Sequence, residues 1–368
     1  MTRKMKILHI NTERTWRGGE QQTLNLLAGL NERQIAAHLV CQAGSLIEER
    51  AARIGVDVFP IPMRGEIDLA ASFQIRKLIN EFNYNIIHAH TSHAHSLAFL
   101  ASIRTRVIRL VTRRVDFTIF RNRFLPLNGI KYRFMADYYI AISKKIKEVM
   151  VKDGIAADRI FVVYSGIDLE RFYGATGDYL IPEFSLQPDE PVVINVAHLA
   201  EHKGQQFLVR AIPHVLKQIP SARFFIIGEG KLLGELQALS ASLGITQALT
   251  FTGFRKDVGA FYQTADLFIM SSVQEGLGTA MIDALALGKP VVAANAGGIP
   301  EIIKDGETGR LVEAANPQAL AQGIIQMLTH KDQAQAMAQR GQALVKEQFS
   351  IEAMVENNLT VYRQLLDI

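Results

Sequence analysis

Two carboxylates lie in an apolar, glycine-rich segment near the end of the chain. Residues 271–303 have the sequence SSVQEGLGTAMIDALALGKPVVAANAGGIPEII, in which Glu275 and Asp283 stand eight positions apart. A carboxylate accepts two hydrogen bonds from a vicinal diol, and hydrogen bonds to charged groups contribute about 1.5–3 kcal/mol each. The chemistry that this pair predicts is recognition of a ligand rich in hydroxyl groups.

The backbone between the two acids is suited to an anion. We expect a strand over 267–271, a loop over 272–278 and a helix over 279–287, where Gly288 ends the helix. Glycines let a ligand approach the backbone, and the free N–H groups and dipole of a helix start favour an anion such as a diphosphate. Two acids that bind diols, beside a site for an anion, match a sugar nucleotide, which has a sugar, a diphosphate and a ribose. The alternative is that Asp283 lies on a solvated helix face and Glu275 caps the helix.

A family resemblance rests on this segment and on blocks along most of the chain. The spacing Glu275-x7-Asp283, followed by ALALGKPVVAANAGGIPEII, resembles the E-x7-E signature region of retaining glycosyltransferases of family 4, which have the GT-B fold. Other blocks resemble the family in the family's order: WRGGEQQTLNLLAGL, NIIHAHTSHAH, YYIAISKKIKE, VVYSGIDLERF, LAEHKGQQFLV, FFIIGEGKLL and LTFTGFRKDV.

The resemblance implies roles for the donor-side residues. Glu275 would contact hydroxyls of the donor sugar, Asp283 would hold the ribose hydroxyls, and Lys203 would neutralise the diphosphate. Backbone N–H groups near the sugar and phosphates would come from Gly276, Leu277, Gly278 and Thr279. Apart from the resemblance, Lys203 is also explained as part of an exposed helix start.

Two positions depart from the family pattern. Asp283 replaces the usual second Glu, and His198 stands where the family commonly has Arg, five residues before the lysine. A histidine that is neutral near pH 7 would leave more of the phosphate charge to Lys203. The departures bear on donor affinity and its pH dependence.

Glycines and an aromatic residue mark other expected borders of the donor. Gly18 and Gly19 follow the first strand; they form either a plain turn or, by the resemblance, a loop near the diphosphate and the acceptor. The chain has no G-x-G-x-x-G in this region, which disfavours a dinucleotide, and no separate cofactor is expected because the donor is a co-substrate. Gly228 and Phe254 follow strands of the second half, where they would border the base or form simple loops.

Four histidines, His88, His90, His93 and His95, invite comparison with a metal site. No acid lies between Glu81 and Asp116 to orient such ligands, and no Asp-x-Asp occurs, so no metal is predicted. The resemblance instead implies that His90 lies beside the reacting centre of the donor sugar.

A basic segment, residues 104–133, contains nine Lys or Arg and one acid, with Phe117, Phe120, Phe124 and Leu125 among them. An anionic glycolipid or membrane surface fits this composition, and Arg113 and Arg114 are then expected to bind the acceptor. Nucleic acid fits the charge but no recognised motif, so no nucleic-acid partner is predicted. A plain basic surface is the third interpretation.

The elements that must position these residues alternate between apolar runs and amphipathic stretches, which predicts parallel sheets with helices on both faces. The runs expected to be strands are 6–11, 38–42, 85–90, 107–112, 138–142, 191–197, 222–228, 248–252, 267–271 and 290–295. The series restarts after the proline-containing stretch 181–191, which is a candidate linker. The residues 351–366 form an amphipathic stretch.

Composition agrees with two soluble α/β domains. The chain has 368 residues, of which 48% are hydrophobic and 21% charged, and Cys41 is its only cysteine. Residues 1–185 carry 26 Lys and Arg against 18 Asp and Glu, whereas residues 186–368 carry 14 against 18. The start does not resemble a signal peptide and the longest uncharged stretch contains four histidines, so a cytoplasmic protein is expected, with peripheral contact at the inner face of a membrane as an option.

The resulting prediction is a GT-B protein with two Rossmann-like, doubly wound parallel-sheet domains facing across a cleft. The resemblance places residues 351–368 with the first domain, so the acceptor domain is 1–185 plus 351–368 and the donor domain is 186–350. The expected reaction is retaining, metal-independent transfer from a nucleotide sugar to a glycan or glycolipid in cell-envelope or lipopolysaccharide synthesis. A sugar-nucleotide epimerase, a phosphorylase and a non-catalytic binding protein are the alternatives.

Overall fold

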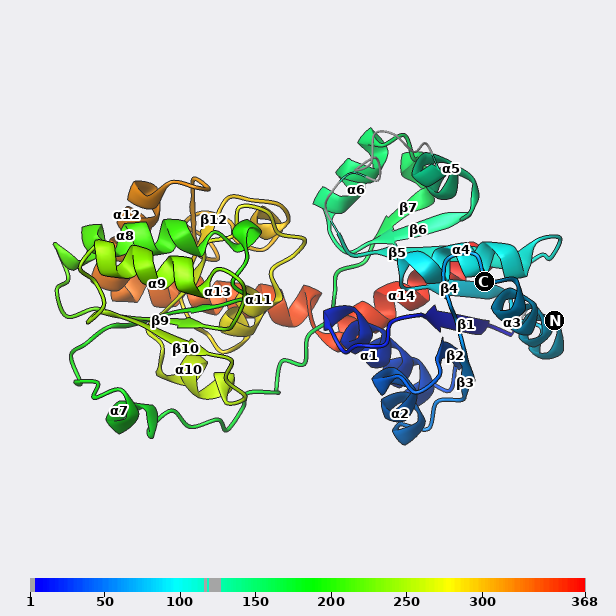
Figure 1. Cartoon of the computed structure of the whole chain (residues 1–368), viewed down its shortest axis with the longest axis horizontal. Helices are drawn as coiled ribbons and strands as arrows, with labels where there is room; N and C mark the ends of the chain where they lie inside the picture. Colours follow the sequence, from blue (N-terminus) through cyan, green and yellow to red (C-terminus); the bar gives the residue numbers. More distant parts are fainter. Residues whose placement is uncertain (1–3, 116–117, 119–126, 368) are drawn as a thin grey trace. The chain divides into compact units, whose positions relative to one another are not determined.

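The chain folds into two compact α/β units (Figure 1). The computed structural model describes residues 4–115, 118 and 127–367. The first unit comprises Met1–Gly166 and Ile351–Ile368, and the second comprises Ile167–Ser350. The C-terminal segment thus belongs to the same unit as the N-terminus.

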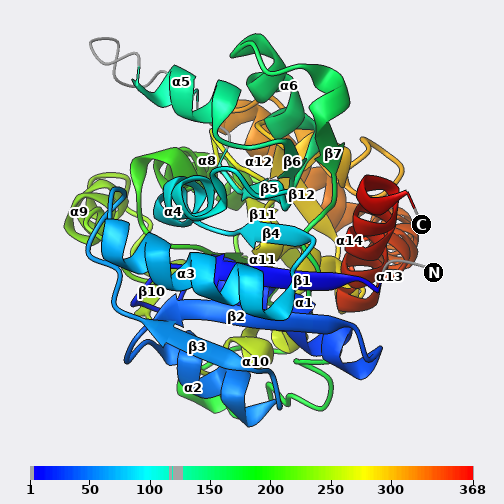
Figure 2. The same ribbon diagram turned by 90° about the vertical axis from the view of Figure 1, so that its right-hand side faces the viewer.

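The first unit contains a seven-stranded parallel sheet in the order β3-β2-β1-β4-β5-β6-β7, part of which is visible in the turned view (Figure 2). The order reverses between β1 and β4. The strands are β1 Lys6–Asn11, β2 Ala36–Gln42, β3 Val58–Ile61, β4 Ile86–Ala89, β5 Ile108–Arg113, β6 Tyr138–Ala141 and β7 Ile160–Val162. The helices are α1 Gly18–Glu32, α2 Leu46–Arg53, α3 Leu69–Phe82, α4 Ser92–Ser102, α5 Leu127–Phe134, α6 Lys144–Lys152 and α14 Ile351–Leu366, with the short 3-10 helix η1 Ala157–Arg159.

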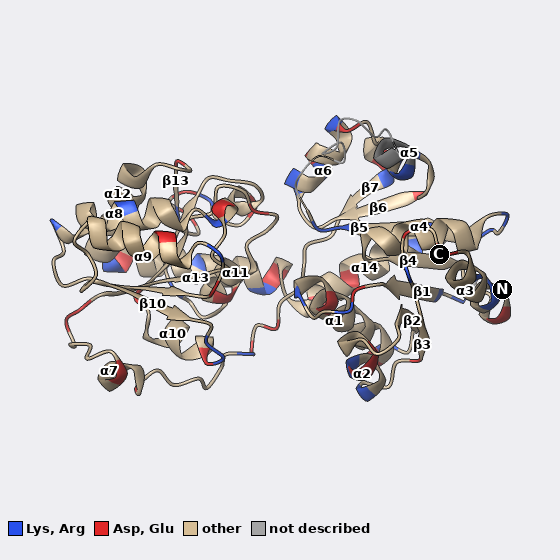
Figure 3. Ribbon diagram, in the orientation of Figure 1, with Lys and Arg blue, Asp and Glu red and all other residues tan. Residues whose placement is uncertain are grey.

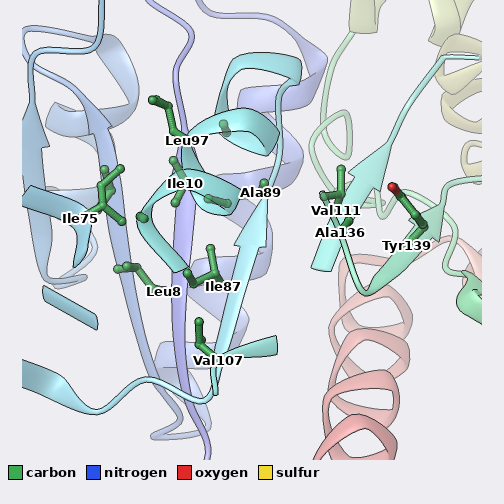
Figure 4. Close-up of a cluster of buried hydrophobic side chains, with 14 of the residues drawn as sticks. Leu8, Ile10, Ile75, Ile87, Ala89, Leu97, Val107, Val111, Ala136 and Tyr139 are labelled. Atoms are coloured by element: carbon green, nitrogen blue, oxygen red, sulfur yellow. The ribbon is translucent and has the colours of Figure 1, made fainter. Parts of the chain in front are cut away.

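Apolar side chains cover both faces of this sheet, which explains why its strands are nearly continuous apolar runs. On one face, Leu8 and Ile87 pack with Leu97 of α4 and Ile75 of α3 (Figure 4). On the other face, side chains of α1, α2 and α14 form a second core cluster, which includes the fully buried Tyr362. The C-terminal helix is therefore part of the core of the first unit.

The second unit contains a six-stranded parallel sheet in the order β10-β9-β8-β11-β12-β13, which reverses between β8 and β11. The strands are β8 Val192–Val196, β9 Arg223–Ile227, β10 Leu249–Gly253, β11 Leu267–Met270, β12 Val291–Ala294 and β13 Arg310–Val312. The helices are α7 Leu180–Glu183, α8 Gln205–Leu216, α9 Leu233–Ser242, α10 Val258–Thr264, α11 Thr279–Ala286, α12 Pro317–Thr329 and α13 Lys331–Gln348, with the 3-10 helices η2 Glu201–Lys203 and η3 Ile299–Glu301.

The boundary between the units differs from the expected one at 185/186. Residues 167–185 belong to the second unit because their aromatic side chains pack there. The ring of Phe172 lies 5.4 Å from that of Tyr262, and the ring of Phe184 lies 4.9 Å from that of Phe225. The stretch 181–191, expected as a linker between domains, is thus a surface segment of the second unit that contains α7.

Charged residues of both signs are spread over the helices, and α2, for example, carries acids and bases side by side (Figure 3). Among the helices of the described residues, none combines the length and the hydropathy that crossing a membrane requires.

Candidate active site

Lys203 and Glu275 meet at the point where the strand order of the second sheet reverses. Lys203 ends the 3-10 helix that follows β8, and Glu275 lies in the loop that follows β11. The strands β8 and β11 are neighbours in the sheet, so their carboxyl ends lie side by side. In open parallel sheets, ligands bind at this reversal point because the two loops diverge there.

The two side chains form a partly buried ion pair. Lys203 Nζ lies 2.5 Å from Glu275 Oε2, and the side chains are 21% and 13% exposed. The hydroxyl of Ser272 donates to the same carboxylate oxygen at 3.2 Å. The other oxygen of Glu275 has no hydrogen-bond partner among the described residues, so it is available to accept from a ligand hydroxyl.

Two glycines allow the backbone segments around this pair to touch. Gly204 has φ +64°, and a Cβ on it would lie 2.2 Å from the Ser271 carbonyl oxygen. Gly297 has φ +55°, and a Cβ there would lie 1.8 Å from the carbonyl oxygen of Glu275. The next residue, Gly298, donates its N–H to that same oxygen at 2.8 Å. A side chain at either glycine would therefore displace the loop that carries Glu275.

Helix α11 begins directly after this loop, as predicted. Its N-cap is Gly278, with φ +86°, and the N–H groups of Thr279 and Ala280 have no acceptor among the described residues. Gly276 is partly exposed, whereas the side chain of Leu277 is buried, so Leu277 can offer only its backbone to a ligand. The helix start thus provides the anion-favouring N–H groups that the glycine spacing predicts.

Asp283 lies on the second turn of α11, where it is 5% exposed. Arg171 Nη2 lies 3.0 Å from Asp283 Oδ2, while the buried Oδ1 has no partner among the described residues. Burial raises the pKa of Asp283 to about 7, although the charge of Arg171 opposes this shift. The guanidinium of Arg171 in turn stacks on Phe172 at 4.2 Å from the ring centroid. Asp283 is therefore a buried acid with one free oxygen, and its ionisation changes near neutral pH.

The remaining donor-side residues of the prediction lie at the same edge of the second sheet. His198 follows β8 and is exposed, Gly228 follows β9, and Phe254 follows β10 and is 65% exposed. Gly228 has φ +141°, and a Cβ on it would lie 2.1 Å from the Ala197 carbonyl oxygen. The structure thus gathers these residues, Lys203 and Glu275 at one sheet edge, and their roles toward a ligand stay predictions.

In the first unit, His90 follows β4 at the strand reversal of the first sheet and is 6% exposed. Its Nε2 lies 2.9 Å from Nδ1 of His9, and the two rings stack with centroids 5.2 Å apart. Nδ1 of His90 is buried without a partner among the described residues. Burial lowers the pKa of His90 well below its usual value and lowers that of His9 to about 3, so both rings are neutral at pH 7.

His88 completes a buried histidine trio with His9 and His90. Its two ring nitrogens are bonded to the hydroxyls of Tyr362, at 2.7 Å, and Thr112, at 2.6 Å. Within the described part of the chain, this trio is the one group with the ligand atoms for a metal ion. Both ring nitrogens of His88 are thus hydrogen-bonded, and the pKa of His88 and of His90 is lowered first by burial and further by neighbouring groups that include Arg114. That no metal binds here stays a prediction.

The other predicted residues of the first unit lie at the carboxyl edge of its sheet. Gly18 begins α1 with open space around it, and a Cβ on Gly19 would lie 3.7 Å from Arg114 Cδ. Burial lowers the pKa of Arg114 to about 10, with Glu20 opposing, so Arg114 remains charged. Arg113 is buried and donates to the Tyr132 hydroxyl at 2.9 Å. Arg113 is thus engaged in packing, whereas Arg114 lies against the glycine loop.

Part of the predicted basic segment, including Phe117, Phe120, Phe124 and Leu125, lies outside the described residues. Of the two other histidines in the HAHTSHAH run, His93 is exposed and His95 is buried. The His95 ring contacts Tyr132 edge-on at 5.2 Å, so its role is packing.

Sequence reasoning missed His9 and Arg171, which contact His90 and Asp283. His9 lies in an apolar strand 81 positions before His90. Parallel pairing of β1 with β4 brings His9 opposite His88. The sequence therefore indicates that His9 lies near the other histidines only when the strand order is known. Arg171 lies in the stretch that was assigned to the other domain.

Comparisons with known proteins decide the family. A family model described as Glycosyltransferase Family 4 matches residues 16–171, and one described as Glycosyl transferases group 1 matches residues 180–344. The chain belongs to the group 1 glycosyltransferases of family 4. The two matches together span most of both units, so the resemblance found in the sequence is confirmed.

Individual relatives of this glycosyltransferase differ in the activity their names give. N-acetyl-alpha-D-glucosaminyl L-malate synthase of Bacillus anthracis is 27% identical over 81% of this chain and 80% of its own length. The lipopolysaccharide core biosynthesis glycosyltransferase LpsE of Rhizobium meliloti is 30% identical over 48% of this chain and 50% of its own.

Solved structures support the fold. A glycosyltransferase from Rickettsia africae superimposes with a TM-score of 0.86 at 22% identity, covering 99% of both chains. Anabaena Alr3699/HepE in complex with UDP and glucose gives a TM-score of 0.81 at 22% identity, covering 99% of this chain and 100% of its own. The predicted GT-B fold is thereby confirmed.

Proposed function

We propose that this glycosyltransferase transfers a sugar from a nucleotide-sugar donor to a hydroxyl of a glycan or glycolipid acceptor, with retention of anomeric configuration. The second unit would bind the donor and the first unit the acceptor. The observation that carries the proposal is the Lys203–Glu275 pair at the strand reversal, with Asp283 eight residues further on the adjoining helix.

Each part of a nucleotide sugar has a matching group in the second unit. The free oxygen of Glu275 would accept from sugar hydroxyls, and the free Oδ1 of Asp283 would accept from the ribose. The ammonium of Lys203 and the N–H groups that begin α11 would face the diphosphate. That the solved structure of Anabaena Alr3699/HepE contains UDP and glucose supports a nucleotide-sugar donor.

The chemistry follows from the charge that develops on the leaving diphosphate. Donors fixed in advance toward that charge lower the barrier most, and Lys203 and the start of α11 are such donors. They would act without a metal. Front-face attack assisted by the leaving phosphate accounts for retention.

The acceptor is proposed to belong to the cell envelope, with the protein acting in the cytoplasm or at the inner face of the membrane. The Rhizobium meliloti relative is named for lipopolysaccharide core biosynthesis, and the solved WaaB structure for a lipopolysaccharide outer core galactosyltransferase. The basic residues of the first unit fit a phosphorylated or lipid-linked acceptor.

The test is a donor panel of UDP, GDP and ADP sugars, each incubated with envelope lipid and glycan extracts. Release of nucleoside diphosphate that requires an acceptor, is unchanged by EDTA, and yields a product of unchanged anomeric configuration by NMR supports the proposal. Conversion of the nucleotide sugar to its epimer without any acceptor would instead identify a sugar-nucleotide epimerase.

A further inference from the structure

A cavity of about 550 Å³ lies at the carboxyl edge of the first sheet, within the first unit. Its walls come from the β1–α1 loop, from the ends of β2 and β3, and from the start of α4. The lining residues are Thr12, Glu13, Arg14, Thr15, Arg17, Gln42, Met63, Arg64 and His93. This volume is in the range that holds small-molecule ligands.

The cavity carries excess positive charge. Arg14, Arg17 and Arg64 line it against a single lining carboxylate, Glu13. In the described part of the chain, none of these three guanidinium groups has an ion-pair partner within 4.0 Å. Three unpaired cations around one concave space favour an anion with several oxygens.

Three further acids among the described residues lie near the cavity, and none of them forms an ion pair within 4.0 Å with Arg14, Arg17 or Arg64. The carboxylate of Glu20 accepts from the Arg17 backbone N–H at 3.0 Å and from Asn11. Glu66 pairs with Lys131 at 3.0 Å. Asp68 caps α3 by accepting from the Ala71 N–H at 3.0 Å, and its other oxygen accepts from the backbone N–H of Arg64 at 3.0 Å.

The loop that carries Arg14 and Arg17 is held in place. The Glu13 N–H donates to the Asn11 side chain at 3.0 Å. The Arg50 guanidinium of α2 stacks on the Trp16 ring at 3.8 Å from its centroid. The floor is fixed by Gln42, whose amide both donates to and accepts from the backbone of Met63, at 2.8 and 2.6 Å. A site held in its binding geometry loses less conformational entropy when a ligand binds.

The cavity adjoins the end of β4 that carries His90. Thr12 Oγ1 lies 2.6 Å from Oγ1 of Thr91, the residue after His90. His93, on the first turn of α4, is also part of the lining. Helix α1 begins at Gly18, directly after Arg17, which places the positive end of a 15-residue helix at the rim.

From this arrangement we propose that the cavity binds a phosphate group carried by the acceptor. The name acceptor rests on the proposed function; the anion site itself rests on the cavity and its arginines. Arginine suits phosphate because its planar fork donates two hydrogen bonds to two oxygens. The space beyond the arginines would admit the sugar or glycerol that bears the phosphate, with its hydroxyl directed toward the His90 side.

The test measures binding by calorimetry, without turnover, in 150 mM sodium chloride. The probes are inorganic phosphate, glucose 6-phosphate and sn-glycerol 3-phosphate, with glucose and glycerol as neutral counterparts. The single tryptophan of the chain, Trp16, lies in the binding loop, so its fluorescence reports whether the site is this cavity. Sedimentation with phosphatidylglycerol vesicles tests whether the protein binds the phosphate of a lipid, and comparison with the soluble probes shows which kind of phosphate it prefers.

We expect the phosphorylated probes or the anionic vesicles to bind, and the neutral counterparts not to. Arg14→Gln and Arg64→Gln should each weaken binding about three- to tenfold, since exposed charge pairs contribute modestly, and the double variant should weaken it further. The matched control is Arg53→Gln, an exposed arginine of α2 that pairs with Glu49, which should leave binding unchanged.

The outcomes separate this inference from the proposed function. Phosphate binding that survives Arg14→Gln/Arg64→Gln but is lost in Lys203→Met overturns the cavity and leaves the transferase proposal standing. Absence of binding by every phosphorylated probe and by the vesicles also overturns it. Binding lost in the double variant, in a protein that turns over no nucleotide sugar, supports the cavity and counts against the transferase proposal.

Discussion

Replacement of Lys203 by methionine removes one positive charge from the strand reversal and keeps most of the side-chain volume. Lys203 Nζ lies 2.5 Å from Glu275 Oε2 in a pair that is 21% and 13% exposed. At such partly buried sites an effective dielectric of about 20 applies, and unit charges about 4 Å apart then interact by about 4 kcal/mol. We take about 4 kcal/mol as the order of magnitude of what the ammonium contributes to a bound diphosphate.

The interaction with Lys203 raises kcat only to the extent that it is stronger in the transition state than in the complex with bound donor. If about half a charge develops on the leaving phosphate, the contribution is about 2 kcal/mol, or about 30-fold in rate. Loss of a fixed donor in a water-excluded site costs up to about 10³-fold. We therefore expect kcat of Lys203→Met to fall between about 30-fold and 10³-fold.

The assay is steady-state release of nucleoside diphosphate, with folding checked by circular dichroism and the melting temperature. The matched control is Lys231→Met, which removes a lysine paired with Glu201 at 3.0 Å on the surface of the same unit and should leave kcat unchanged. A folded Lys203→Met protein with unchanged kcat, or with a change confined to KM, would refute the assigned role.

Substitutions at three further residues, Asp283, Gly297 and His9, test the other assignments. Burial raises the pKa of Asp283 to about 7, above its unfolded value of about 4. The protonated carboxyl therefore makes its whole contribution to the free energy of unfolding below pH 4, and this contribution is lost as pH rises through 7. In wild-type protein this loss lowers the free energy of unfolding by at most about 4 kcal/mol between pH 4 and 8, and Asp283→Asn should remove it, as measured by urea unfolding. If the free energy of unfolding of the variant falls with pH as steeply as that of the wild type, Asp283 is not the group responsible. The same variant should weaken donor binding about tenfold at pH 8, whereas Asp283→Glu should retain it, and equal affinities in the two refute the ribose role. Gly297→Ala should lower the free energy of unfolding by about 2–4 kcal/mol, because its Cβ would lie 1.8 Å from the Glu275 carbonyl oxygen at φ +55°, and a change below about 0.5 kcal/mol argues against that geometry. His9→Leu leaves His90 Nε2 without its 2.9 Å partner and should lower kcat about tenfold with little change in donor KM, whereas His9→Gln should restore part of kcat; equal kcat in both variants excludes a positioning role for the His9 bond.

The strands that flank the two strand reversals were predictable because they are central. β1, β4, β8 and β11 are buried on both faces, so each appears as a largely apolar run. β3, β7 and β13 were missed. They lie at sheet edges and contain only three or four residues, and β3 includes Pro60, which an edge strand tolerates because one side of its backbone is unpaired.

The proximity of the residues that we propose to bind the donor was predictable, because they lie close together in sequence or match a family pattern. Glu275, the glycines and Asp283 share one strand-loop-helix unit, so spacing alone indicates their proximity. Arg171 lies 112 positions before Asp283, and no periodicity links the two. Its position became clear only because the aromatic side chains around residues 172–184 pack on the second unit.

The arginine cavity shows a different limit of sequence reasoning. Arg14 and Arg64 lie 50 positions apart and come together because β3, β2 and β1 are adjacent. The charge count found the excess of positive charge in residues 1–185 but pointed to residues 104–133, where the basic residues are dense in sequence. How many charged side chains gather at one edge of a sheet depends on the order of the strands, and composition does not give that order.

A thermal-shift titration against UDP, GDP, ADP and their common sugar derivatives tests the central claim most directly, because it needs no acceptor. At a nucleotide concentration of about 100 times Kd, binding stabilises the protein by about 2.7 kcal/mol, which raises the melting temperature of a unit of this size by about 5–10 °C. We expect such a rise with the nucleotides of one base, and a smaller rise in Asp283→Asn at pH 8. No rise with any nucleotide or nucleotide sugar would contradict the assignment of Lys203, Glu275 and Asp283 to a donor site.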